Sequence, residues 1–206
     1  MAKKKVQPVP KGYHTVTPHL VLDECAKAIE FYRRAFGAEE TARMPGPGGK
    51  VVHAEIRVGD SPVMLADEMP PMPGQPGAYK SPRSAGLSTA SLFLYVPDVD
   101  AAFERAVKAG CTVRMPVTDM FWGDRFGQVI DPFGHTWGLA THVEDVSPEE
   151  MARRHEEFVA QMQPGRPPAA ERPKDKRGAK KKGTQAAPAR KPAAKPAAKK
   201  KRPARR

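Results

Sequence analysis

The chain has 206 residues and a formal net charge of +12, from 35 Lys and Arg against 23 Asp and Glu. Residues 163–206 hold 17 of these basic residues and two of the acidic ones, which leaves 18 basic and 21 acidic residues in the rest. No stretch approaches the roughly 18 apolar residues that span a bilayer, and the basic start lacks the apolar core of a signal peptide. We therefore expect a cytoplasmic protein with reduced thiols at its two cysteines, Cys25 and Cys111.

The first half of the chain predicts the order strand, helix and three strands. Residues 1–12 form a basic, Pro-containing arm that we expect to be disordered. A strand at 15–22 is followed by a helix at 24–36, whose apolar residues recur at helical spacing and which ends before Gly37. Three more strands are predicted at 39–44, 51–58 and 62–66. This βαβββ module occupies residues 13–68.

The second half repeats that order after a Pro- and Gly-rich linker at 69–90. It predicts a strand at 91–96, a helix capped by Asp98 that runs to Ala109 with Phe103 and Val107 facing inward, and a strand at 112–115. Two final strands flank Asp131-Pro132-Phe133-Gly134, in which proline fixes φ and glycine supplies a positive φ. The sequence thus predicts an α+β domain at 13–146. In it, two βαβββ modules, 13–68 and 91–146, form curved sheets around a cavity suited to a small ligand.

Two segments follow this domain. Residues 147–162 predict a docked helix, because Ser147 and Glu150 fit a capping box with Pro148 at the first helical position. Residues 163–206 contain no aromatic residue and no Leu, Ile or Val, so we expect a disordered Lys-, Ala- and Pro-rich tail.

The tail predicts binding to a polyanion by counterion release, without sequence preference. DNA, RNA and ribosomes would serve equally, and a solubilising tail without a partner is the alternative. The residues expected to contact nucleic acid are Lys180, Lys181, Lys182, Arg190, Lys191, Lys199, Lys200, Lys201 and Arg202. If the partner is DNA, the protein would associate with the nucleoid.

The repeated order, the helix AIEFYRRAFGAE and the ending IDPFGHTWGLATH resemble the vicinal oxygen chelate superfamily. This superfamily includes glyoxalases, bleomycin-resistance proteins and extradiol dioxygenases. The segments YHTVTPHLVL, GDSPVMLADE, GDRFGQVIDPFGH and LATHVEDVSPEEM are most similar to its PhnB-like branch. The resemblance implies a small-molecule site and a homodimer, but it does not fix a substrate, because one fold hosts many chemistries.

Metal-using members of the superfamily take one ligand from the first and one from the last strand of each module. Those places fall near Thr17, Met64, Ser91 and Gly138, none of which suits a divalent metal. A slip of two residues would bring in His19 and Phe93, which is still short of the three ligands that a metal site normally needs. We therefore expect no metal and no other cofactor.

Polar and aromatic residues on the predicted strands supply the candidate ligand-binding side chains. These are His19, His53, Glu55, Phe93, Trp122, Asp124, Arg125 and Trp137. Asp124 and Arg125 could instead form a surface ion pair, His53 could be a half-exposed strand residue, and His135 could bond only the turn at Asp131. Catalytic residues are not identified.

Three hypotheses remain from the sequence. The first is a metal-free binding domain for a small organic molecule, with a tail that binds nucleic acid. The second is a metal-dependent lyase, isomerase or dioxygenase, which convergence of His19, His53 and Glu55 would support. The third is a nucleoid-associated accessory protein with a cavity filled by Met64, Phe93 and Trp137.

Overall fold

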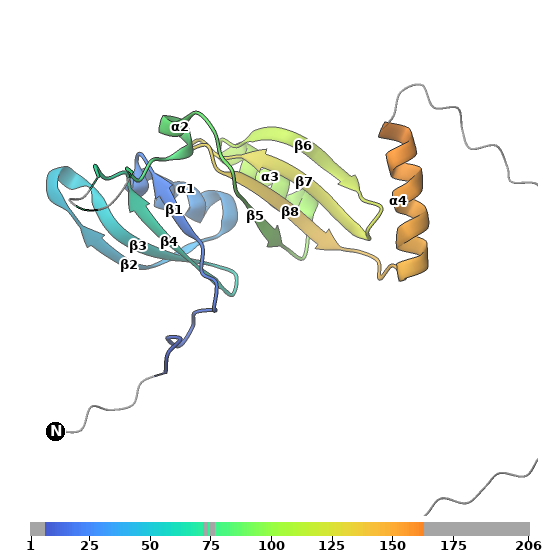
Figure 1. The fold of residues 1–206 in the computed structure, drawn as a ribbon, viewed down its shortest axis with the longest axis horizontal. Helices are drawn as coiled ribbons and strands as arrows, with labels where there is room; N and C mark the ends of the chain where they lie inside the picture. The colour runs from blue at the N-terminus through green and yellow to red at the C-terminus, as the bar shows by residue number, and fades with distance from the viewer. Residues whose placement is uncertain (1–6, 72–73, 75–76, 163–206) are drawn as a thin grey trace, which may run out of the picture. The chain divides into compact units, whose positions relative to one another are not determined.

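The computed structural model describes residues 7–71, 74 and 77–162, which contain two sheets of four strands each (Figure 1). Residues 1–6 of the arm and the whole tail at 163–206 lie outside this description. The elements of the first module are β1 (His19–Leu22), α1 (Cys25–Phe36), β2 (Glu39–Pro45), β3 (Val51–Val58) and β4 (Ser61–Asp67). Those of the second are β5 (Ser91–Tyr95), α3 (Val99–Ala109), β6 (Thr112–Asp119), β7 (Asp124–Ile130) and β8 (Thr136–His142). The predicted α+β fold of two βαβββ modules is confirmed.

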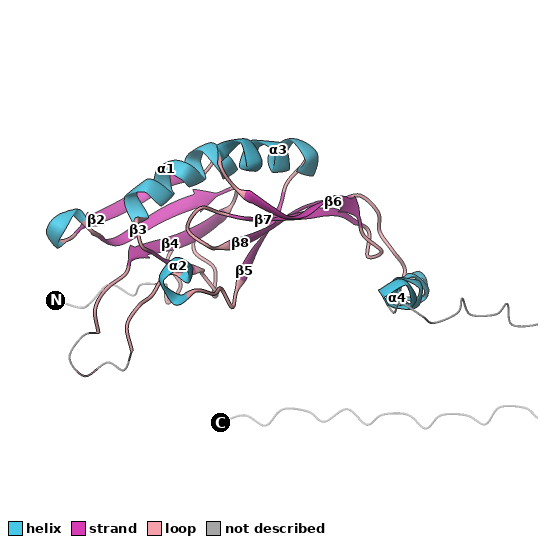
Figure 2. Cartoon of the chain, turned by 90° about the horizontal axis from the view of Figure 1, so that it is seen from above, coloured by secondary structure: helices cyan, strands magenta, loops and turns pink. Residues whose placement is uncertain are grey.

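The two sheets share one topology. Sheet one has the order β1-β4-β3-β2 and sheet two the order β5-β8-β7-β6. The first strand of each module pairs in parallel with the last, and the other pairs are antiparallel. Helices α1 and α3 contact each other and lie on the same side of the two sheets (Figure 2). Each sheet therefore has one face under a helix and one face, called here its open face, that no helix of its module covers.

The two long helices of the modules form where the sequence predicts them. In α1 the apolar stripe is buried, and Gly37 ends the helix at φ 69° while its N–H donates to the Tyr32 carbonyl. In α3 the Asp98 side chain accepts from the N–H of Ala101 at 3.0 Å, which is an N-cap. Phe103 packs partly buried against the core, but the expectation for Val107 is wrong, because it lies 36 % exposed beside the edge strand β6.

The turn between β7 and β8 also joins the two modules. Asp131 is buried, and its Oδ1 accepts from the backbone N–H groups of Phe133 and His135, both at 2.9 Å. Its Oδ2 accepts from the Tyr32 hydroxyl of α1 at 2.8 Å and from the Trp137 indole at 2.9 Å. The predicted turn is present, and the Asp131 side chain both holds it and links it to α1. Four donors on one buried carboxylate leave little of its charge unsatisfied.

Two strand boundaries differ from the prediction for reasons of proline chemistry. Strand β1 begins at His19 rather than at residue 15, after Pro18, which has no N–H to donate and whose carbonyl accepts from Met64. Strand β6 continues to Asp119 rather than ending at residue 115. It tolerates Pro116 because it is an edge strand whose pairing shifts between Met115 and Thr118.

The linker and the C-terminal segment hold short-range structure. The linker contains a one-turn helix, α2 (Pro82–Ala85), capped by Ser81. Outside the linker, a short turn, η1 (Pro47–Gly49), precedes β3 in the first module.

The C-terminal helix is α4 (Pro148–Met162), and the Ser147 hydroxyl accepts from the N–H of Glu150 as the cap predicts. The expected docking is slight, because α4 buries no residue. It touches the domain through ring contacts of Phe121 and through the ion pair of Arg154 with Glu144.

Candidate ligand-binding site

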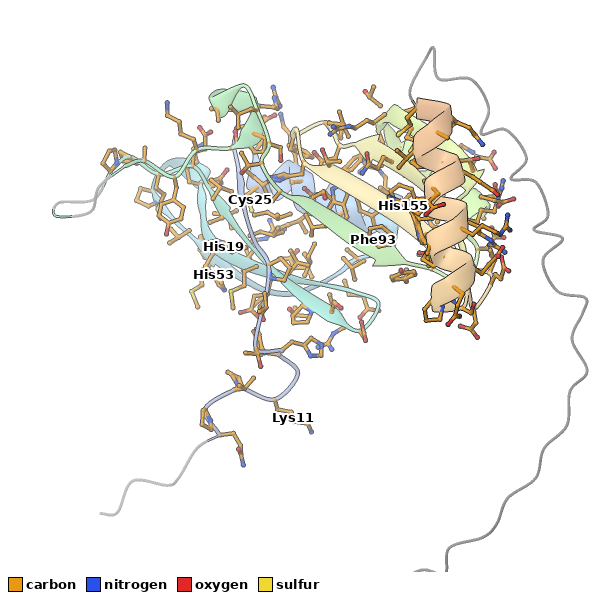
Figure 3. The ribbon with its side chains drawn as sticks, turned by 45° about the vertical axis from the view of Figure 1, so that its right-hand side comes forward. Lys11, His19, Cys25, His53, Phe93 and His155 are labelled. Atoms are coloured by element: carbon orange, nitrogen blue, oxygen red, sulfur yellow. The ribbon has the colours of Figure 1, made fainter. Side chains whose placement is uncertain are left out.

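The open face of sheet one carries titratable side chains. His19 of β1 and Glu55 of β3 both stand opposite Met64 of β4, so the three residues form one row across the sheet. His53 follows two residues from Glu55 on the same face, since strand side chains alternate. Figure 3 shows His19 and His53 near each other on this sheet. The three residues thus share one face, but among the described residues no three His, Cys, Asp or Glu side chains are placed to hold a metal ion, so the convergence that would support the metal-dependent hypothesis is not found there.

Glu55 organises this group. It accepts a hydrogen bond from the Tyr13 hydroxyl and lies 3.0 Å from Nε2 of His53. These two hydrogen bonds, that of Tyr13 first, lower the pKa of Glu55 below its usual range. Partial burial, and then the neighbouring His53, lower the pKa of His19, which favours a neutral imidazole. The face therefore presents a carboxylate held by two partners beside a neutral imidazole, a pattern suited to hydrogen-bonding a ligand.

The open face of sheet two is aromatic instead. Phe93 of β5 stands opposite Gly138 of β8, and its ring is parallel to that of Phe126 of β7, with centroids 5.2 Å apart and an interplanar angle of 2°. A Cβ on Gly138 would lie 2.8 Å from the Phe126 ring and 3.0 Å from the Phe93 ring. The missing side chain thus leaves room for both rings above the strand. The ring of Tyr95 lies 5.0 Å from that of Phe93.

A buried carboxylate fixes one end of this aromatic face. Asp124 is 3 % exposed, and its Oδ2 accepts from the Tyr95 hydroxyl and the Trp122 indole, each at 2.9 Å, while Oδ1 lies 2.8 Å from Nδ1 of His142. Burial alone would raise the pKa of Asp124, but hydrogen bonds from His142, Tyr95 and Trp122 together lower it. The pKa of His142 is raised by its hydrogen bonds with Asp145 and Asp124. Asp124 is therefore an ionised anchor for aromatic side chains.

A pocket of about 510 Å³ lies where the two modules meet, and it takes one predicted residue from each open face, His19 and Phe93. Figure 3 shows these two on β1 and β5. The wall is mostly apolar, as in typical small-molecule pockets. The lining residues are His14, Val16, Pro18, His19, Leu20, Val58, Ser61, Pro62, Val63, Ala90, Ser91, Leu92, Phe93, Leu94 and Trp137.

The structure corrects the placement of Arg125 and adds detail to those of Trp137 and His135. Arg125 does not share a surface with Asp124, because neighbouring strand residues face opposite ways, and Arg125 instead pairs with Asp100 of α3 and Asp119 of β6. The alternative of an Asp124–Arg125 ion pair is wrong for the same reason. Trp137 lines the pocket but is 1 % exposed, since it packs in the core under α1. The expected bond of His135 with Asp131 is made by its backbone N–H, at 2.9 Å, while its ring bonds the Val21 carbonyl of β1 at 3.2 Å.

Sequence reasoning missed Tyr13, Tyr95 and Phe126. Strand alternation could have found the last two, because Tyr95 follows Phe93 by two residues and Phe126 follows Asp124 by two. Tyr13 reaches Glu55 from a segment without regular structure, 42 residues away in sequence, and no local pattern indicates such a contact.

The metal expected of many relatives does not fit the residues at the matching positions. The register places Met64 opposite His19 and Gly138 opposite Phe93, so these four positions offer one imidazole, a soft thioether and no carboxylate. Within residues 7–71, 74 and 77–162, no three His, Cys, Asp or Glu side chains are placed to hold a metal ion. Cys25 and Cys111 are buried and free, and burial raises the pKa of each thiol to about 12.

Comparison with known proteins places these features in a family. The family described as the Glyoxalase/Bleomycin resistance protein/Dioxygenase superfamily matches residues 13–139. The uncharacterized protein Mb0911c of Mycobacterium bovis is 47 % identical over 136 residues, which cover 66 % of this chain and 88 % of that protein.

No helix in the described residues is long and apolar enough to cross a membrane.

Solved structures of similar fold include TioX from Micromonospora sp. ML1, at 26 % identity and a TM-score of 0.51, with 63 % of this chain and 99 % of that chain covered. They also include a PhnB protein from Bacillus cereus, at 19 % identity and a TM-score of 0.48, with 62 % and 99 % covered. The sequence-based recognition of the superfamily is confirmed.

Proposed function

The chain belongs to the glyoxalase/bleomycin resistance protein/dioxygenase superfamily, and we propose that it binds a small organic molecule, without a divalent metal, in the pocket between its modules. The observation that carries the proposal is the pocket itself, which is mostly apolar and has His19 on one side and Phe93 on the other. Ligand sites of soluble proteins combine an apolar wall with a few polar groups in this way.

A thermal-shift screen of the full chain against a library of small organic compounds tests this proposal. We expect at least one compound to raise the melting temperature, because a ligand that binds only the folded state stabilises it. The variant Ser91→Trp fills the pocket from β5 and should abolish the shift, whereas Ser88→Trp, on an exposed loop outside the lining, should keep it. A shift that survives Ser91→Trp would contradict the pocket as the site.

The metal-dependent alternative has a direct test. Elemental mass spectrometry of the desalted full chain, after incubation with Zn, Mn, Fe, Co and Ni, should find well below one metal per chain, because Met64 and Gly138 occupy ligand positions of the family. A stoichiometric metal would make a lyase, isomerase or dioxygenase the better account.

The tail supports a second role, which is sequence-independent attachment to nucleic acid. Its net charge of +15 over 44 residues would attract phosphate and release counterions. DNA affinity of the full chain should fall steeply with salt and disappear when residues 163–206 are deleted, with thermal melting confirming that the shortened chain is folded. Undiminished affinity after the deletion would contradict this role.

We also propose a homodimer. Large apolar side chains on the open faces, among them Met44, Phe93 and Tyr95, are 49 to 61 % exposed in the single chain. A second copy facing these sheets would remove apolar surface from water and close the ligand site from above. Light scattering on the eluted full chain should give twice the chain mass, and a monomer at micromolar concentration would contradict the proposal.

A further inference from the structure

We propose that residues 13–18, called here the strap, close one side of the pocket between the modules, and that the bond of Tyr13 to Glu55 is the latch that holds the strap there. The inference deepens the proposed function, because it concerns how a ligand reaches the same pocket. Every second residue of the strap lines the pocket, namely His14, Val16 and Pro18. The strap is therefore part of the pocket wall, and moving it opens the pocket.

One end of the strap is fixed by sheet one. The Pro18 carbonyl accepts from the N–H of Met64 at 2.9 Å, and the pairing of β1 with β4 begins at the next residue, His19. Figure 3 shows the chain running back from His19 to Lys11, which lies outside both sheets. The strap thus leaves the sheet at Pro18 and needs a second attachment to stay at the pocket.

The Tyr13 hydroxyl supplies the second attachment. It donates to the carboxylate of Glu55 on β3, which is an inner strand of sheet one. Glu55 is itself held in place, because its Oε1 lies 3.0 Å from Nε2 of His53. Hydrogen bonds to an ionised carboxylate are stronger than those between neutral groups. The latch therefore joins the strap to a fixed and charged acceptor.

Between its two attachments the strap is weakly held. In the described part of the chain, no backbone group of residues 14–17 bonds to a strand, and the Thr17 hydroxyl donates within the strap, to the His14 carbonyl at 3.2 Å. Val16 is 82 % exposed although it lines the pocket. Segments with so few contacts open at a lower free energy than the strands beside them. Loss of the latch should therefore release the strap while the sheets stay folded.

A thiol placed in the pocket wall measures this opening without any ligand. Val63 of β4 precedes the residue that holds the end of the strap, lines the pocket and is 3 % exposed, so Val63→Cys in the full chain is a suitable probe. The native Cys25 and Cys111 are buried, and burial raises the pKa of each to about 12. Both should react slowly with the thiol reagent DTNB in the folded chain, and the chain without Val63→Cys gives that background rate.

Three variants of the Val63→Cys chain test the latch. Tyr13→Phe removes only the donor and should raise the labelling rate about tenfold, because the open strap becomes more populated. Tyr95→Phe is the matched control, since it removes a hydroxyl from another carboxylate, Asp124 on sheet two, and should change the rate less than about twofold. Glu55→Gln keeps an acceptor without the charge and should give an intermediate rate.

The number of labelled thiols separates opening of the strap from unfolding. Release of the strap exposes the introduced thiol alone, whereas unfolding also exposes the two native ones. Labelling of all of them at the raised rate would show that Tyr13 stabilises the whole domain and would overturn the inference. Equal rates for Tyr13→Phe and Tyr95→Phe would refute the latch. With the latch intact, labelling as fast as that of Ser88→Cys on the exposed loop would refute closure by the strap.

A compound from the thermal-shift screen extends the test to the ligand. It should dissociate about tenfold faster from Tyr13→Phe than from Tyr95→Phe, because most changes of affinity appear in the dissociation rate. Equal dissociation rates would show that the ligand leaves by another route and that the strap does not control access. The labelling decides on the strap and the screen decides on the proposed function, so either can fail while the other stands.

Discussion

The two modules share one topology but present different chemistry on their open faces. Sheet one offers Tyr13, His19, His53 and Glu55, which titrate or donate hydrogen bonds, whereas sheet two offers stacked rings anchored on Asp124. The buried faces of both sheets are alike, because each must pack under an amphipathic helix. Packing under a helix thus requires similar apolar residues on the covered faces of both sheets. The open faces are under no such requirement and carry different side chains, so we look for function on the open faces.

The hairpin turns of the two modules differ most in their contribution to stability. Asp131→Ala removes the acceptor of four hydrogen bonds and leaves buried donors unsatisfied, so it should cost about 3 to 5 kcal/mol. Asp60→Ala, in the exposed turn of the first module, should cost no more than about 0.5 kcal/mol. Urea unfolding of both variants measures this, and equal losses would show that the second turn does not join the modules.

A pair of glycines gives the next largest difference. Gly59 and Gly123 have φ of 60° and 94°, but a Cβ on Gly59 meets nothing, whereas one on Gly123 would lie 2.1 Å from the Glu144 carbonyl. Gly59→Ala should cost about 1 kcal/mol from backbone strain, and Gly123→Ala about 2 to 4 kcal/mol from strain and crowding together. Thermal denaturation of the two variants compares them, and a larger loss for Gly59→Ala would refute the close approach at Gly123.

The dependence of stability on pH should also separate the modules. Hydrogen bonds with Asp145 and Asp124 raise the pKa of His142 in the folded protein above its usual value of 6.5. The protonated imidazole therefore stabilises the fold fully below pH 6.5. This stabilisation is lost as pH rises through the pKa of His142 in the folded protein. His142→Gln should therefore flatten the fall in melting temperature as pH rises above 6.5. The lowered pKa of Asp124 acts at the other end, since that stabilisation is lost as pH falls below the carboxyl range. An unchanged profile in His142→Gln would contradict this account.

The smallest expected effect concerns the first module. Tyr13→Phe removes the first of the two hydrogen bonds that lower the pKa of Glu55, so this pKa should rise towards 4.5 while the fold is kept. A carboxyl group with a lowered pKa stabilises the folded protein above its usual pKa, and this stabilisation is lost when acid protonates the group. Tyr13→Phe should therefore lose slightly less stability on acidification than the unchanged chain does. NMR titration of the Glu55 carboxyl measures the shift, and no change would place Tyr13 away from Glu55 in solution.

Local patterns in the sequence predicted the fold well. Short local sequences determine three of its features, namely the apolar stripe of α1, the Asp98 cap of α3 and the turn at Asp131. Patterns of this length decide helices and turns, so the repeated module was recognisable. Where a boundary failed, as at Pro18 and Pro116, the position of the strand in the sheet decided the outcome.

The candidate site was only partly predictable, because its key contacts join residues far apart in sequence. His19, His53, Glu55 and Phe93 follow from strand alternation, but the contact of Asp124 with Tyr95 spans 29 residues and that of Tyr13 with Glu55 spans 42. Arg125 was misplaced because its partners, Asp100 and Asp119, lie on the helix side of the sheet. Which face a strand residue takes needs the tertiary arrangement.

The most direct test of the central claim is a ligand thermal-shift measurement on chelator-treated full chain, repeated after adding Zn and Mn. We predict that a compound raises the melting temperature equally with and without metal, because among the described residues no three His, Cys, Asp or Glu side chains are placed to hold a metal ion. A shift that appears only after metal is added would contradict metal-free binding in the pocket between the modules.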